Sequence, residues 1–153
     1  MKKITLQLFL SLFIVQSISS QNFASQTSTL NIKKTSEKII LDGILDEMAW
    51  KQSDSAYNFT QNFPSDTSLA IAQTVVYIRY DDQNIYVGAK LYNAPGPRKY
   101  VTTSLRRDFR GEGNDSFSVI FDPFQDKTNG TIFGMNPFGV RREGFISNGG
   151  SGR

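Results

Sequence analysis

The chain has 153 residues, with 17 Lys and Arg residues against 14 Asp and Glu residues, and it contains no cysteine and no histidine. The lack of cysteine excludes disulfides and thiol nucleophiles, and the lack of histidine excludes Ser-His-Asp catalysis and His-ligated zinc. A metal site would need oxygen ligands, which favours calcium.

The first 20 residues have the pattern of a secretory signal peptide. Lys2 and Lys3 form a positive start, residues 6–15 are mostly apolar, and small residues precede a predicted cleavage near Ser20–Gln21. The apolar run is shorter than the ~20 residues of a membrane-spanning helix. Cleavage removes two lysines and no acid, which leaves 15 basic and 14 acidic residues. This near-neutral balance argues against nucleic-acid binding.

A polar, flexible lead-in is predicted for residues 21–37, which are rich in Ser, Thr and Gln. The segment that follows changes structure twice. Residues 39–41 form an apolar, strand-like run, and Asp42–Gly43 is a typical turn pair. Asp46 then stands at the expected N-cap of a short helix near residues 46–52.

The only tryptophan, Trp50, ends this segment, and Glu47 lies in the favourable first turn of the predicted helix. Trp50 could be a platform for a sugar ring, but its position favours core packing. Asp42 and Asp46 could bind calcium, but a turn and a cap explain both without a metal.

Alternating apolar residues predict a series of short strands. The clearest are Leu69–Tyr80 and Ile85–Tyr92, which flank a hairpin turn at residues 81–84. Further strands are expected at residues 57–60, 100–105, 115–121, 131–136 and 140–146.

Strands at this spacing, with one short helix and no βαβ rhythm, predict an all-β fold. The expected architecture is an antiparallel β-sandwich of the jelly-roll kind over residues 38–146. A flexible tail is expected at residues 147–153, because this end is rich in Gly and Ser.

Four sequence blocks in this order resemble the family 9 carbohydrate-binding module, a β-sandwich of secreted bacterial proteins. The first block is the fold signature formed by Asp42, Gly43, Asp46, Glu47 and Trp50. The second block runs from Thr74-Val75-x-Tyr77 through Tyr80-Asp81-Asp82 to Ile85-Tyr86-Val87. The third runs from Asn114-Asp115-Ser116-Phe117 to Phe121-Asp122-Pro123, and the fourth is Asn136-Pro137-x-Gly139. The nearest branch stands at the N-terminus of long outer-membrane or surface proteins. Its members continue past the equivalent of Ile146, so the chain is expected to be an incomplete member.

The resemblance implies that aromatic rings clamp a sugar, with one clamp residue just before the strand that starts at Asp115. The nearest aromatic residue is Phe109, and the second clamp residue is expected beyond Arg153. Phe109, Glu112, Asn114 and Asp115 are therefore the candidate carbohydrate-binding residues.

A structural calcium ion is also implied by the family, and three aspartates are its candidate ligands. Asp115, Asp122 and Asp126 flank one predicted strand and the loop after it. Asp122 followed by Pro123 is also an ordinary strand end. Asp115 and Asp122 would lie about 23 Å apart along a strand, which is too far for a glycosidase pair. The charges at residues 141–143 are interpreted as solvent-facing.

The sequence therefore predicts a non-catalytic carbohydrate-binding module that binds a poly- or oligosaccharide in carbohydrate catabolism. The predicted location is the periplasm, the outer membrane or the exterior of a Gram-negative bacterium. One alternative is an assembly domain of a surface protein that has lost sugar binding and reaches the outer membrane through a missing C-terminal region. Another is an accessory module of a glycoside hydrolase.

Overall fold

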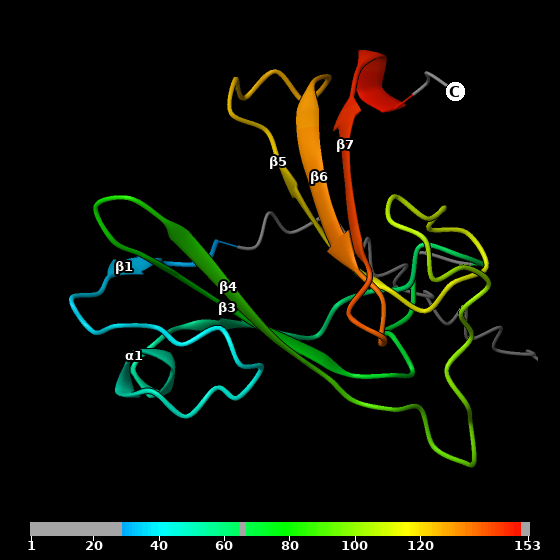
Figure 1. Ribbon diagram of the computed structural model, residues 1–153, viewed down its shortest axis with the longest axis horizontal. Coiled ribbons are helices and arrows are strands. Elements are labelled where there is room, and N and C mark those ends of the chain that lie inside the picture. The colour runs from blue at the N-terminus through cyan, green and yellow to red at the C-terminus, as the bar shows by residue number, and fades with distance from the viewer. Residues whose placement is uncertain (1–28, 65–66, 151–153) are drawn as a thin grey trace, which may run out of the picture. The chain divides into compact units, whose positions relative to one another are not determined.

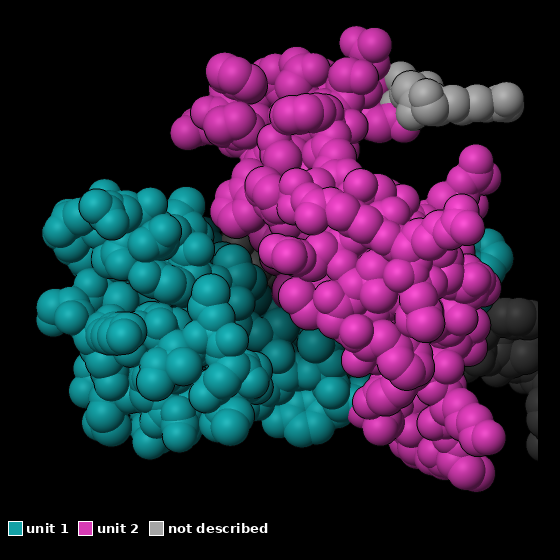
Figure 2. All heavy atoms as spheres, in the orientation of Figure 1, with its two compact units in different colours: residues 1–92 teal, residues 93–153 magenta. Residues whose placement is uncertain are grey.

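The computed structural model of the protein describes residues 29–64 and 67–150, and the predicted signal peptide lies outside this part. The chain divides into two compact units, residues 1–92 and 93–153, which Figure 2 draws in different colours. In the described part of the chain, no helix is long and apolar enough to cross a membrane.

The sheet of unit 1 is built around one long hairpin (Figure 1). Strands β3 (Thr74–Tyr80) and β4 (Ile85–Leu91) pair antiparallel over their whole length. β1 (Lys33–Lys34) joins β3 in parallel, and β2 (Ser55–Ala56) joins it antiparallel. The predicted hairpin is thus confirmed, although β3 begins at Thr74.

The hairpin turn is held by the side chain of its first residue. Asp81 Oδ1 accepts hydrogen bonds from the backbone N–H groups of Gln83 at 2.7 Å and Asn84 at 2.6 Å. The backbone N–H of Asp81 also donates to the Asn84 carbonyl at 3.0 Å. An aspartate that bonds the backbone two residues on is the physical reason for this turn.

Strand β1 lies within the segment predicted to be a flexible lead-in. Lys33 pairs with Arg79 and Lys34 with Tyr80, and the Thr35 N–H donates to the Tyr80 carbonyl at 2.8 Å. The end of β3 extends beyond its pairing with β2, so its backbone groups there are free to form hydrogen bonds with this polar segment. A two-residue strand shows no alternation that a sequence pattern could reveal.

The short helix α1 (Met48–Lys51) begins later than predicted, and the expected N-cap at Asp46 is wrong. The N-cap residue is Glu47, whose side chain makes no capping bond. The carboxylate of Glu37 serves instead, because it accepts hydrogen bonds from the N–H groups of Met48 at 3.3 Å and Ala49 at 2.7 Å. A cap supplied from eleven residues away leaves no local signature.

The core of unit 1 forms around Trp50, as predicted. Ile39, Ala49 and Trp50 are buried together, and Trp50 is only 4% exposed. The Trp50 ring meets Tyr77 edge-on with 6.5 Å between ring centroids. Gly88 lies beneath the Trp50 ring, where a Cβ would come within 3.4 Å of the indole.

The turn before the helix is also confirmed. The Ile44 N–H donates to Asp42 Oδ1 at 2.8 Å, and Gly43 has a φ of 82°. Glycine alone adopts such an angle without a steric penalty. The aspartate and the glycine therefore have structural roles in the turn.

Unit 2 contains a three-stranded antiparallel sheet in the order β5 (Phe117–Phe121), β6 (Gly130–Met135) and β7 (Arg141–Ile146). The strand expected at residues 100–105 does not form. Instead, the Asp115 N–H donates to the Val101 carbonyl and the Val101 N–H donates to the Asp115 carboxylate, each at 2.7 Å.

Two sheets and one four-residue helix account for nearly all regular structure in the described residues, with a short 3-10 turn at Asn148–Gly150. The predicted all-β, sandwich-like fold class is confirmed.

Candidate functional site

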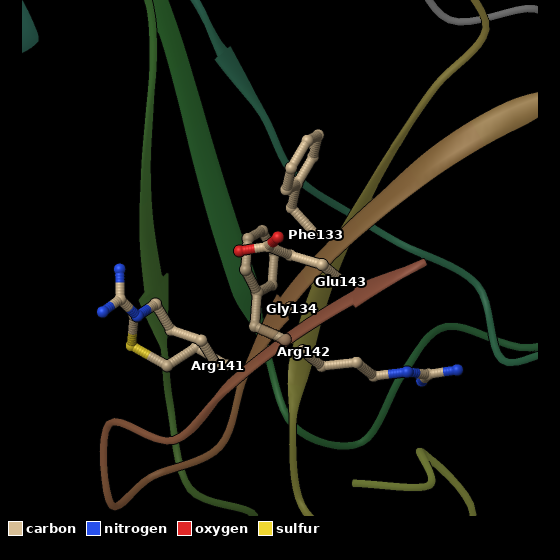
Figure 3. Close-up of a pocket in the computed structure, with 7 residues that line it drawn as sticks. Phe133, Gly134, Arg141, Arg142 and Glu143 are labelled. Atoms are coloured by element: carbon tan, nitrogen blue, oxygen red, sulfur yellow. The ribbon is translucent and has the colours of Figure 1, made fainter. Parts of the chain in front are cut away.

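A hollow of about 220 Å³ lies on the sheet of unit 2 (Figure 3). All three strands contribute to its wall. The lining residues are Phe117 from β5, Phe133, Gly134 and Met135 from β6, and Arg141, Arg142 and Glu143 from β7.

The strand register explains why rings and charges meet on one face. Phe117 pairs with Met135, which pairs in turn with Arg141, and Phe133 pairs with Glu143. Residues directly opposite each other in antiparallel strands project on the same side of the sheet. An apolar surface with a charged margin therefore forms on this face.

Phe133 gives the hollow its aromatic character. Its side chain is 47% exposed, and its ring meets Phe121 edge-on with 6.0 Å between centroids. One side of the ring is thus supported by a neighbour while much of its surface stays open. A ring of this kind can stack on an apolar ligand face at little cost in side-chain order.

The free edge of β7 is partly covered by the loop that precedes β5. Asp108 donates its N–H to the Arg141 carbonyl at 3.0 Å and accepts the Glu143 N–H at 2.9 Å. Arg107 forms an ion pair with the Glu143 carboxylate at 2.7 Å. These contacts protect part of the edge from pairing with another strand, and they fix Glu143 beside the hollow.

A second hollow, of about 440 Å³, lies in unit 1 beside the β3–β4 turn. Its carboxylate, Asp81, is already used, since the Tyr86 hydroxyl donates to it at 2.7 Å. This bond and the N–H of Gln83 lower the pKa of Asp81 to about 2. The carboxylate thus acts in the turn and has little bonding capacity left for a ligand.

None of the four residues predicted to bind carbohydrate lines the hollow of unit 2. Phe109 is only 4% exposed, so its ring packs inside the unit and offers no face to a sugar. Asn114 accepts the N–H of Thr103 at 2.6 Å and donates to the Arg110 carbonyl at 2.7 Å. Glu112 is exposed in the same loop.

Asp115, the fourth of these residues and a candidate metal ligand, forms an ion pair with Arg98 at 2.6 Å. It precedes β5, whereas Asp122 and Asp126 follow that strand. In the described residues, no three acidic side chains come together in a way that could hold a metal ion.

Asp122 and Asp126 organise the loop between β5 and β6. Asp122 accepts the Lys127 N–H at 2.8 Å, and Asp126 accepts the Thr128 N–H at 2.8 Å and the Asn129 side-chain amide at 2.7 Å. The bond from the Asn129 side chain, which is the largest cause, and the bond from the Thr128 N–H lower the pKa of Asp126 far below its ordinary range. Calcium binding by these aspartates stays a prediction.

Sequence reasoning missed the hollow, although it identified the two strands whose residues form most of it. The charges at residues 141–143 were expected to face solvent, and Arg141 and Glu143 are indeed exposed. A turn at Pro137–Gly139 fixes the β6–β7 register. That register was the signal that could have placed Phe133 beside Glu143.

Comparison of the chain with known proteins gives no match to a family model, to a curated protein or to a solved structure. The resemblance to the family 9 carbohydrate-binding module therefore stays a prediction.

Proposed function

We propose that the chain is a non-catalytic carbohydrate-binding module of an exported protein, and that the hollow on the β5–β6–β7 sheet is its sugar-binding surface. The observation that carries this proposal is the half-exposed ring of Phe133 with Arg141 and Glu143 on the same face of the sheet.

The chemistry of sugars suits such a surface. The C–H face of a pyranose is apolar and stacks on an aromatic ring, while the hydroxyl groups at its rim need hydrogen-bond partners. Phe133 supplies the ring, and Glu143 supplies an acceptor whose position is fixed by Arg107. The Met135 side chain, half exposed beside them, extends the apolar floor.

The same lining supports binding without hydrolysis. Glycoside hydrolysis needs two carboxyl groups roughly 5–10 Å apart across the scissile bond. Among the residues that the structure describes, Glu143 is the only acidic one that lines this hollow, and it already pairs with Arg107. A bound saccharide would therefore be held and not cleaved.

Calorimetry of the full chain with xylo-, cello- and gluco-oligosaccharides tests the proposal. Phe133→Ala removes the stacking ring and is expected to weaken binding by about tenfold. Phe124→Ala is the matched control, because this ring is 76% exposed on a loop of the same unit outside the hollow. Absence of heat from folded protein with every saccharide, or equal losses in both variants, would contradict the proposal.

An assembly domain is the second candidate, and the number of exposed large apolar side chains favours it. Phe145, Leu41 and Phe63 are each at least 87% exposed. Exposed apolar surface is a mark of protein contact sites. An assembly domain predicts association that rises with protein concentration and ignores added saccharide, which sedimentation velocity measures directly.

A further inference from the structure

The charges around the hollow of unit 2 do not balance. Glu143 is paired with Arg107, whose guanidinium lies 2.7 Å from its carboxylate. Arg141, its neighbour on the same face, makes no side-chain hydrogen bond or ion pair with any residue in the described part of the chain. Arg142, the other arginine that lines the hollow, makes none either, so in the described residues the hollow carries two cations without a polar partner.

The two arginines at the hollow differ in where they point. Figure 3 shows the side chains of Arg141 and Arg142 leaving β7 on opposite sides. Arg142 is half-buried and packs against Gly111, where an added Cβ would collide with its guanidinium. Arg141 is exposed and stands opposite Met135, on the face that carries Phe133. Arg141 is thus free to meet a ligand stacked on that ring.

The backbone beneath Arg141 is held in place. Its carbonyl accepts the Asp108 N–H at 3.0 Å, and its strand pairs with β6 on the other side. A guanidinium on a fixed strand offers two parallel N–H donors that match the two oxygens of a carboxylate. The geometry thus provides an apolar ring and a carboxylate fork on one face.

We propose, building on the proposed function, that this hollow selects anionic saccharides, and that Arg141 binds the carboxylate of a uronic acid whose ring lies on Phe133. Neutral saccharides stack on the ring but leave Arg141 without a partner. Because the ion pair is exposed to solvent, the preference depends on ionic strength.

Trigalacturonic acid and its methyl ester form the test pair, since the ester keeps the sugar and removes the charge. In calorimetry of the full chain at low salt, the acid is expected to bind about fivefold more tightly than the ester. Raising the salt to about 0.5 M shortens the Debye length and should remove most of this difference.

Two matched variants assign the preference to a residue. Arg141→Gln should bind the acid and the ester alike, while Arg106→Gln, an exposed arginine outside the hollow, should keep the fivefold preference. Circular dichroism confirms that both variants fold.

Each contrary result identifies which proposal fails. Equal binding of acid and ester by the native chain overturns the selectivity, and a preference that survives in Arg141→Gln overturns the role of Arg141. Sugar binding stands in both cases. Absence of binding to the acid, to the ester and to the neutral oligosaccharides overturns the proposed function and the selectivity with it.

Discussion

The two units of the chain use their apolar residues differently. In the described residues, four of the five buried apolar side chains belong to unit 1, and unit 2 contributes only Phe109. Trp50 is enclosed in unit 1, whereas Phe133 in the sheet of unit 2 remains 47% exposed. The largest ring of unit 1 thus packs in its core and stabilises it, whereas unit 2 presents a ring at its surface.

The polar groups show the same division. In unit 1, the buried Arg79 donates through Nε to the Ala49 carbonyl at 2.8 Å and to Ser53 Oγ at 2.6 Å, which fastens the helix to the sheet. Glu47 accepts the Ile40 N–H at 2.7 Å, and this bond is the main cause of its lowered pKa. In unit 2, Arg141 has no such internal role. Polar side chains that are bonded within the protein stabilise the fold, whereas a polar side chain without an internal partner at a hollow can bind a ligand.

The largest expected effect is on stability, and it separates a buried ring of unit 1 from an exposed ring of unit 2. Trp50→Ala should lower the free energy of unfolding by about 3–5 kcal/mol, because it removes a buried ring and leaves a cavity. Phe145→Ala should change it by about 0.5 kcal/mol or less, because this ring is 90% exposed. Urea denaturation of both variants measures the contrast, and comparable losses would break the division between the units.

A second prediction concerns the cap of helix α1 in unit 1. Glu37→Ala should cost about 1 kcal/mol, since the carboxylate accepts the N–H groups of Met48 and Ala49 at the start of α1. Asp46→Ala should be nearly neutral, because Asp46 is exposed and is not the N-cap residue. A larger loss in Asp46→Ala would restore the cap that the sequence pattern suggested.

The smallest effect concerns the acid limit of unit 1. The Tyr86 hydroxyl is the largest cause of the lowered pKa of Asp81, which is about 2. A lowered carboxyl pKa in the folded state gives stability that is present above the ordinary pKa of aspartate. This stability is lost as the pH falls through the folded-state pKa.

Tyr86→Phe should raise the pKa of Asp81 in the folded state and shrink that contribution. The loss of stability on acidification should therefore be smaller than in the native chain and should be complete at a higher pH. Urea midpoints measured between about pH 2 and pH 5 would show the change. Tyr92→Phe, which alters an exposed tyrosine, should follow the native curve. Identical curves for all three proteins would remove Tyr86 from the account.

Local patterns predicted the parts of the fold that depend on neighbours in sequence. The Asp42–Gly43 turn, the burial of Trp50 and the β3–β4 hairpin followed from side-chain chemistry and alternation within a few residues. The cap from Glu37 joins residues eleven and twelve positions apart. It could not be predicted, because nothing local distinguishes one exposed glutamate from another.

The candidate site was harder to predict than the fold, for the same reason. Phe109 was chosen for its position before a strand, but burial removes its ring from the surface. Phe133 and Arg141 come together only through the pairing of β6 with β7. Register decides which side chains share a face, and a shift of one residue would reverse the result.

A titration of the ¹⁵N-labelled full chain with trigalacturonic acid, followed by amide chemical shifts, tests directly whether the hollow of unit 2 binds a saccharide. We expect the largest shifts to cluster at Phe117, Phe133–Met135 and Arg141–Glu143 in unit 2, with little change around Trp50 in unit 1. Shifts that centre on unit 1, or a spectrum that does not change at saturating saccharide, would contradict this expectation.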